Sequence, residues 1–281
     1  MRTPRVLMCP PDFYGIEYEI NPWMNRRVET DHATATIQWR RLREELETLG
    51  VVVQTLTPEP GLPDLVFTAN AGLIHHNTFI SSRFRHGVRQ GETPHFERWA
   101  DAAGFEVVRL PEGYLFEGAG DALFCGETLY AGYRFRSDVR SHQWVADRIG
   151  VEVLPMELVD PRFYHLDTCF CPLAEREALY FPGAFDDYGR RVLRERIPGL
   201  IEVGAEEAAS FSCNAVVVGR DVVLNEETPG LTRALGEAGY IVHPVRLTEF
   251  IKAGGSAKCL TLRLDGEDAA SWARRSDPSP P

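Results

Sequence analysis

The chain has 281 residues, with 44% hydrophobic and 25% charged side chains, the composition of an ordinary globular protein with one large domain or two smaller ones. Its net charge of −11 repels nucleic acid and anionic membranes, which argues against both as partners and favours a cationic ligand. No apolar run approaches the roughly 18 residues of a membrane span, and Pro10 and Pro11 interrupt the short apolar stretch near the N-terminus, so we expect a cytoplasmic protein without a signal peptide.

One phrase recurs along the chain: an amphipathic helix, a glycine and then an apolar strand. It occurs five times, around Gly50, Gly104, Gly150, Gly199 and Gly239. We expect each glycine to end its helix in the left-handed conformation. In the first predicted helix the apolar residues are spaced by four and three, and therefore share one face: Ala35, Trp39, Leu42, Leu46 and Leu49.

Between these phrases the sequence predicts further strands, several of them paired as hairpins across turn residues. They are Leu65–Thr68, Gly72–Ile74, Thr78–Ser81, Ala122–Phe124, Leu129–Ala131, Cys169–Leu173, Ala178–Phe181, Ala215–Val218 and Val222–Leu224. Each repeat therefore holds about three strands and one helix.

Five units of this kind cannot each bury an apolar face alone. They can close into a ring with the strands inside and the helices outside. A three-layer sandwich of two domains, divided near residue 150, is the alternative. We predict one α/β domain over residues 1–265, followed by a polar, proline-ended and disordered tail over residues 266–281.

The chain contains six cysteines, which we expect to be reduced thiols in a cytosolic protein. Cys169 and Cys171 form a C-x-C pair without a second pair nearby, and the spacing of His165 does not complete a usual zinc site. We therefore interpret these cysteines as alternating strand residues and expect no metal.

Short polar motifs between the repeats converge on the axis if the ring is correct. Four of them carry candidate residues: Asp64 and Asn70 around a strand, Glu117 and Asp121 around a glycine turn, His165 and Asp167 on one side of a strand, and Cys259 after Gly254 and Gly255. Each residue also has a plain structural interpretation, as a turn acid, a loop acid, a core histidine or a small buried side chain. Together, a cysteine and a histidine form a nucleophile with an acid–base partner, and several carboxylates select a cation such as a guanidinium group.

A set of motifs in a fixed order runs from Val6 to Leu264. It consists of NPWM at 21–24, PDLVFTANAGL at 63–73, R-x-G-E at 89–92, FEGAGDAL at 116–123, GYRFRSD at 132–138, YHLDTCFCPL at 164–173, NAVVVG at 214–219 and GGSAKCLTLRL at 254–264. The chain thereby resembles the guanidine-modifying, or amidinotransferase, superfamily, and within its dimethylargininase-related group the arginine dihydrolases. The resemblance implies a five-bladed α/β propeller, the pentein fold, with pseudo-fivefold repeats. It also implies a hydrolase that acts on C–N bonds of linear amidines without a cofactor.

The resemblance implies roles for individual residues. Cys259 resembles the nucleophile that attacks the guanidinium carbon, and His165 resembles the general acid–base. The acids that hold and polarise the guanidinium are Glu117, which we place among the catalytic residues, with Asp64, Asp167 and Asp121. Arg89 and Arg136 resemble the arginines that hold the substrate carboxylate, and the backbone at Ala253 helps to fix the α-amino group. Tyr18 and Asn21 complete the substrate-binding residues and lie in a candidate lid, Asp12–Asn25.

Asn70 departs from the deiminases and dimethylargininases, in which an acid normally occupies this position. An amide offers both a donor and an acceptor, so it can hydrogen-bond a ureido oxygen and keep that intermediate bound for a second attack. The expected reaction is the conversion of arginine to ornithine, two ammonia and carbon dioxide. Arginine deiminase, dimethylarginine dimethylaminohydrolase and amidinotransferase activities remain alternatives, as does a non-catalytic propeller that binds a partner. The sequence leaves a homo-oligomer open.

Overall fold

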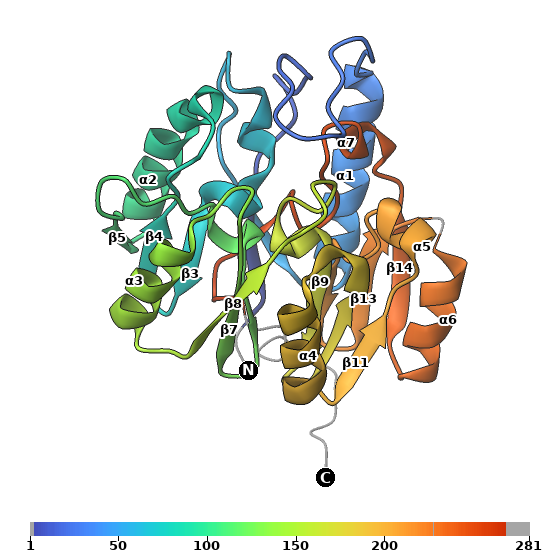
Figure 1. Ribbon diagram of the computed structural model, residues 1–281. Coiled ribbons are helices and arrows are strands. Elements are labelled where there is room, and N and C mark those ends of the chain that lie inside the picture. The colour runs from blue at the N-terminus through green and yellow to red at the C-terminus, as the bar shows by residue number, and fades with distance from the viewer. Residues whose placement is uncertain (1–2, 227, 268–281) are drawn as a thin grey trace.

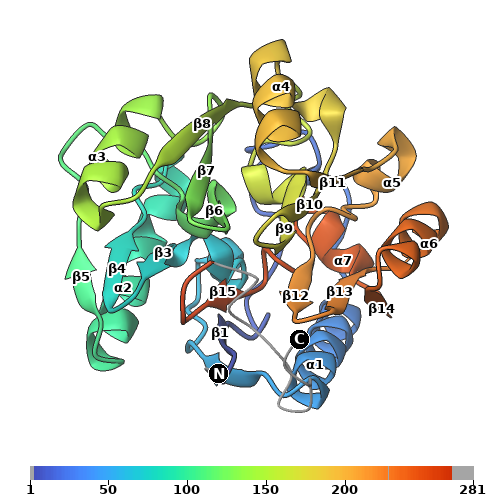
Figure 2. The same ribbon diagram turned by 90° about the horizontal axis from the view of Figure 1, so that it is seen from below.

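Five three-stranded sheets form the core of the computed structural model, which describes residues 3–226 and 228–267. The sheets stand around a common axis, with the long helices outside them (Figure 2). This arrangement confirms the predicted five-bladed α/β propeller, and the two-domain sandwich was the wrong alternative. From residue 268 onward the predicted tail lies outside the described residues.

Each sheet follows the same plan, in which the middle strand pairs antiparallel with one neighbour and parallel with the next strand along the chain. In four sheets the antiparallel neighbour is the preceding strand of the chain, and in the fifth it is the last strand of the described chain. In order of hydrogen-bonded neighbours, the sheets are β15 (Leu262–Arg263), β1 (Arg5–Met8) and β2 (Val52–Thr55); β3 (Gly72–His75), β4 (Thr78–Ser81) and β5 (Glu106–Val108); β6 (Ala122–Cys125), β7 (Thr128–Tyr133) and β8 (Val153–Glu157); β9 (Phe170–Ala174), β10 (Glu177–Tyr180) and β11 (Gly199–Glu202); and β12 (Val216–Val218), β13 (Asp221–Asn225) and β14 (Ile241–Val245). The first sheet joins both ends of the described chain, because β15 pairs with β1.

A long helix connects the two parallel strands of every sheet, since parallel neighbours need a crossover. These helices are α1 (His32–Thr48), α2 (Thr93–Ala102), α3 (Val139–Ile149), α4 (Asp187–Arg196) and α6 (Pro229–Glu237). Two short helices, α5 (Ala205–Ala209) and α7 (Thr248–Ile251), lie in connections. Among the described residues, no helix is long and apolar enough to cross a membrane.

The apolar face of α1 is buried as predicted, and Asp31 caps its N-terminus by accepting a hydrogen bond from the Thr34 backbone N–H. Four of the five glycines that follow helices have the expected positive φ: Gly50, Gly104, Gly150 and Gly239. Gly199 does not, and begins β11 instead. The reason is Pro198, which cannot continue the helix and forces the extended conformation on Ile197, so α4 ends without a left-handed residue.

The predicted strand at Leu65–Thr68 is also wrong. The chain forms two successive 3₁₀ turns there, Pro63–Val66 and Thr68–Ala71. Pro63 favours the start of a turn. The Thr68 hydroxyl donates to the Leu7 carbonyl and thereby links the second turn to β1. The other eight predicted strands all overlap observed ones, with bounds that differ by at most two residues at either end.

Candidate active site

Loops from all five sheets meet at one end of the ring, because corresponding positions of repeats around one axis fall close together. The residues concerned each precede the first strand of a sheet: Asn70 before β3, Glu117 before β6, His165 and Asp167 before β9, Asn214 before β12 and Cys259 before β15. The predicted convergence of the polar motifs is therefore observed, with one element correction. His165 and Asp167 do not lie on a strand, since Leu166–Thr168 is a 3₁₀ turn.

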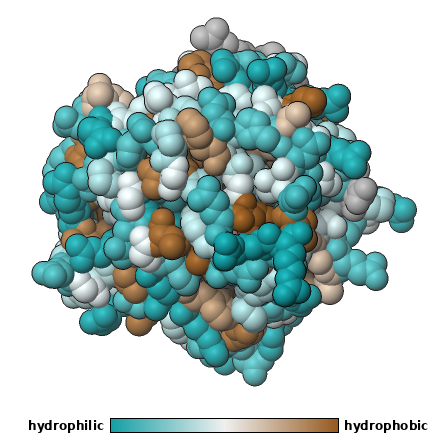
Figure 3. Space-filling view, turned by 90° about the horizontal axis from the view of Figure 1, so that it is seen from above, coloured by the Kyte–Doolittle hydropathy of each residue, from teal (hydrophilic) through white to brown (hydrophobic). Residues whose placement is uncertain are grey.

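A small cavity lies between these loops. The space in it that is open to the centre of a water molecule is about 10 Å³, room for about one water. Seven predicted site residues line it: Asn21, Asp64, Asn70, Arg89, Arg136, Ala253 and Cys259. The predicted lid segment supplies Asn21 together with Ile20 and Met24, and it lies at the top of Figure 1. The same end, seen from above in Figure 3, is mostly hydrophilic. A substrate larger than a water molecule can enter only if the lid segment moves away from the cavity, and this movement is a prediction.

Cys259 lies in a turn that ends just before β15, and its side chain is 3% exposed. The thiol donates to Asp167 Oδ2 at 3.4 Å, and Sγ accepts a hydrogen bond from Asn214 Nδ2 at 3.1 Å. Burial, followed by the charge of Asp167, raises the pKa of this thiol well above its ordinary value. The resting thiol is therefore neutral, and a bound cation would help to ionise it.

The glycines before Cys259 have a packing reason. Gly254 has φ +82°, and a Cβ there would lie 2.8 Å from the Tyr164 hydroxyl. A Cβ at Gly255 would lie 2.4 Å from the Phe67 ring. Both positions allow the backbone to pass tightly against the cavity wall.

His165 and Glu117 form a buried pair beneath the cavity. His165 Nε2 is 2.7 Å from Glu117 Oε2, which also accepts from Arg136 Nη1 at 3.1 Å. Burial lowers the pKa of His165 to about 4, against the effect of Glu117. Burial would raise the pKa of Glu117, but Arg136 and His165 hold it well below its usual value. The pair is therefore a neutral imidazole beside a carboxylate.

The two arginines expected to hold a substrate carboxylate already have protein partners. Arg89 makes a bidentate pair with Glu92, with Nε–Oε1 2.7 Å and Nη2–Oε2 2.8 Å, and its Nη1 donates to Asn70 Oδ1 at 3.0 Å. Arg136 donates to the Ile20 carbonyl at 3.1 Å, so it links the Glu117 pair to the lid segment. These contacts fix both guanidinium groups at the cavity wall.

Asp64 Oδ1, which lies at the cavity, and the Tyr18 hydroxyl beside Asp64 have no partner at hydrogen-bond geometry among the described residues. Burial raises the pKa of Asp64, although Arg89 and then Tyr18 act in the opposite direction. Asp167 Oδ1 is a third such atom, and burial raises the pKa of Asp167 to about 7. Buried acceptors of this kind are suited to a ligand with several N–H donors.

Two of the predicted residues, Asp121 and Asn21, anchor loops of the site. Asp121 does not line the cavity, and instead accepts from Ser137 Oγ at 2.6 Å and from the Leu166 N–H at 3.1 Å, which anchors the turn beside His165. Asn21 donates to the Ala253 carbonyl at 3.0 Å and thereby ties the lid segment to the loop before Cys259.

Three residues at the site were missed from the sequence: Asn214, Glu92 and Tyr164. Tyr164 donates to the Gly254 carbonyl at 2.6 Å, and its ring lies under the Arg136 guanidinium. Asn214 and Glu92 stood inside recognised motifs, NAVVVG and R-x-G-E, but no chemical signal marked them. Only their hydrogen bonds in the folded chain, from Asn214 to Cys259 and from Arg89 to Glu92, identify them as residues of the site.

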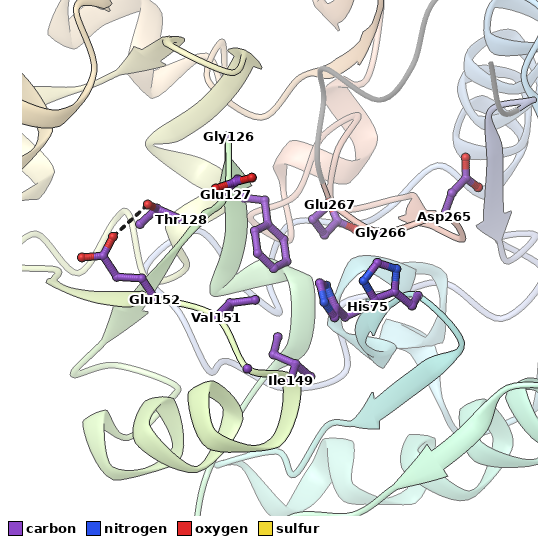
Figure 4. A pocket seen from close by; sticks show the side chains of 13 residues that line it. His75, Gly126, Glu127, Thr128, Ile149, Val151, Glu152, Asp265, Gly266 and Glu267 are labelled. Atoms are coloured by element: carbon purple, nitrogen blue, oxygen red, sulfur yellow. Dashed lines mark hydrogen bonds between the residues drawn. The ribbon is translucent and has the colours of Figure 1, made fainter.

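A larger cavity of about 680 Å³ lies at the opposite ends of the strands. His75, the last residue of β3, and His76 help to line it, whereas Asn70 precedes that strand. Figure 4 shows His75 there with Glu127, Glu152 and Glu267. None of the predicted site residues lines this cavity.

Comparison with known proteins identifies the family of the chain. Residues 17–264 match the family described as N,N dimethylarginine dimethylhydrolase, eukaryotic. The bifunctional arginine dihydrolase/ornithine cyclodeaminase ArgZ of Synechocystis sp. is 48% identical over 265 residues, which are 92% of this chain and 37% of that protein. The N(G),N(G)-dimethylarginine dimethylaminohydrolase of Mycobacterium tuberculosis is 40% identical over 94% of this chain and 86% of that protein. The chain thus spans less than two fifths of the length of ArgZ.

The fold is that of two crystal structures of the N-terminal domain of ArgZ. Both have a TM-score of 0.91 and 46% identity, and cover 95% of this chain and 99% of that chain. One is a cysteine-to-serine mutant bound to substrate, from an arginine dihydrolase of the ornithine-ammonia cycle in cyanobacteria. The other is an asparagine-to-serine mutant covalently bound to a reaction intermediate.

Proposed function

Because the chain belongs to the N,N-dimethylarginine dimethylhydrolase family, we propose that it hydrolyses the guanidinium group of arginine with Cys259 as nucleophile. Within this family the proposed reaction is arginine dihydrolysis, in which arginine and two waters give ornithine, two ammonia and carbon dioxide. The higher identity to ArgZ than to the dimethylaminohydrolase supports this choice.

One observation carries the proposal: unpartnered carboxylate oxygens lie around the same small site as the Cys259 thiol. Asp64 Oδ1 and Asp167 Oδ1 are buried and accept no hydrogen bond from the described residues. A guanidinium group offers several N–H donors in one plane, which can satisfy both acids and hold the central carbon against the sulfur. The net charge of −11 favours such a cation.

The proposed first step is attack of Cys259 Sγ on the guanidinium carbon, which forms a C–S bond and a tetrahedral adduct. The leaving nitrogen needs a proton as its C–N bond breaks. In the resting site that proton is on the thiol, because His165 is neutral and Glu117 is charged. His165 carries it to the departing ammonia and then activates the water that hydrolyses the thiouronium intermediate.

Asn70 supports the second hydrolysis. The side-chain Oδ1 of Asn70 accepts a hydrogen bond from Arg89. Its Nδ2 makes one long hydrogen bond of 3.4 Å, to the Glu117 carbonyl, and this uses one of its two N–H groups. The remaining N–H can donate to the oxygen of a bound ureido intermediate, which an aspartate cannot do. An asparagine-to-serine mutant of ArgZ that holds a covalent intermediate is consistent with an asparagine acting late in such a reaction.

The end products test this proposal. The wild-type protein with arginine is expected to release ornithine, and Asn70→Asp is expected to lower the ratio of ornithine to citrulline at least about tenfold, because one hydrogen bond to the ureido oxygen is lost. Both products are measured by liquid chromatography with mass spectrometry.

Asn77→Asp, in the turn between β3 and β4 at the other end of the strand, serves as the control and should keep the wild-type ratio. Citrulline without ornithine from the wild-type protein would replace the dihydrolase proposal by a deiminase. Release of dimethylamine from dimethylarginine, at a higher kcat/KM than ammonia from arginine, would favour the dimethylaminohydrolase alternative.

Two accompanying proposals concern the setting of the enzyme. A cytoplasmic location is supported by five buried, free thiols: Cys9, Cys169, Cys171, Cys213 and Cys259. A homo-oligomer is compatible with the same chemistry, and sedimentation velocity measures it directly.

A further inference from the structure

Asn214 is a fully buried amide whose contacts converge on the nucleophile. Its Nδ2 donates to Cys259 Sγ at 3.1 Å and to the Asp167 carbonyl at 3.0 Å. Its Oδ1 accepts from the Cys259 backbone N–H at 3.1 Å. The Asn214 carbonyl accepts from the Lys258 backbone N–H at 3.3 Å. One residue before β12 therefore joins the loops that precede β9 and β15.

The orientation of this amide is determined by its partners. The Cys259 backbone N–H can only donate, so the side-chain oxygen must face it. The Asp167 carbonyl can only accept, so the nitrogen must face that side. The second N–H of Nδ2 is thereby aimed at the sulfur, and a reversed amide would lose both backbone contacts.

The sulfur thus lies between an acceptor and a donor. Asp167 Oδ2, at 3.4 Å, can accept the thiol proton but repels a thiolate. Asn214 loses nothing when the thiol ionises, and its hydrogen bond becomes stronger because the acceptor is then charged. The other charged or titratable groups around the sulfur come from two sides. Asp64, Arg89, Arg136 and Tyr164 line the same cavity, and Lys258, the neighbour of Cys259 in the chain, pairs with Glu267 at 3.1 Å.

We propose that Asn214 is a catalytic residue that stabilises the thiolate of Cys259 through its Nδ2–H and fixes the direction from which the sulfur attacks. The inference deepens the proposed function, since it concerns the same nucleophile. The direction of the thiol pKa agrees with it: burial and Asp167 raise this pKa, whereas the hydrogen bond from Asn214 lowers it.

Alkylation of Cys259 tests the inference without any substrate. The rate of reaction with iodoacetamide is measured from pH 6 to pH 10 by mass spectrometry of the peptide that contains Cys259. Asn214→Asp, which is nearly isosteric and cannot donate, is expected to react about tenfold or more slowly at each pH below the thiol pKa. That loss corresponds to an upward pKa shift of about one unit. Asn214→Ala is expected to change the rate in the same direction.

Asn225→Ala is the matched control. Asn225 is also buried and hydrogen-bonded through both ends of its amide, to the Ser210 carbonyl and the Leu247 N–H, but it does not contact Cys259. A merely structural role for Asn214 would lower the melting temperature of its variants, as in the control, and leave the alkylation profile of the folded protein unchanged.

With arginine, the Asn214 variants should lose kcat about tenfold or more while KM stays within about twofold of wild type. Wild-type alkylation rates and pH dependence in folded Asn214→Asp and Asn214→Ala would overturn the inference. If instead the wild-type protein does not act on arginine, the proposed function fails, and the alkylation result still decides the role of Asn214.

Discussion

Replacing Cys259 with serine is expected to lower ammonia release from arginine by about 10⁴-fold or more. The reason is the acidity of the attacking group. The buried site already raises the pKa of the thiol, and a serine hydroxyl is a far weaker acid in the same place. Neither Asp167 nor the neutral His165 is a strong enough base to ionise it. Ammonia release is followed in a coupled assay, and arginine binding to the variant by calorimetry.

Binding should survive this substitution, because the carboxylates of Asp64 and Asp167 remain. Cys125→Ser is the matched control: Cys125 is also buried, and its Sγ donates to the Ala174 carbonyl at 3.4 Å, a contact that a hydroxyl can keep. Full activity of Cys259→Ser would reject the nucleophile assignment. Equal losses in both variants would indicate damaged folding, which thermal unfolding separates from catalysis.

Much of the propeller could be predicted from local patterns. The buried helix face with Trp39 and Leu42 follows from the spacing of apolar residues that is typical of a surface helix. The left-handed conformation of Gly150 follows from its position directly after the last turn of a helix. Gly199 shows the limit, since a neighbouring proline ended the helix before the glycine was needed. The segment Leu65–Thr68 is apolar like a strand, but it is enclosed on every side, and burial alone does not distinguish a strand from a turn.

The site was only partly predictable for a related reason. The order of the motifs indicated which loops converge, and a fivefold ring brings them together whatever the side chains are. The hydrogen bonds that decide the chemistry join residues far apart in sequence, such as Asn214 with Cys259 and Glu117 with His165. No periodic pattern of residues in the sequence indicates such pairs. Asp121 and Glu117 looked alike beside one glycine turn, yet only Glu117 reaches the histidine, because Ser137 and the Leu166 N–H hold Asp121 elsewhere.

His165→Gln is expected to reduce kcat for ammonia release at least about 10³-fold, because one side chain serves two proton transfers, each worth roughly 10² to 10⁴ in rate. The glutamine side chain can occupy the position of the imidazole beside Glu117, but it cannot carry a proton to the leaving nitrogen. Without that proton the first C–N bond does not break. Intact-protein mass spectrometry after mixing with arginine should therefore find no adduct with the mass of arginine less ammonia.

His142→Gln provides a close control for this substitution, because His142 is also buried and burial lowers its pKa to about 4, yet it lies on α3 away from the cavity. The control should retain activity within about twofold, and both variants should unfold at similar temperatures. If the adduct instead forms in His165→Gln at the wild-type rate and persists, the proton for the leaving nitrogen comes from another group. Asp167 would then be that group, since it already accepts the thiol hydrogen bond, and His165 would act only on the water.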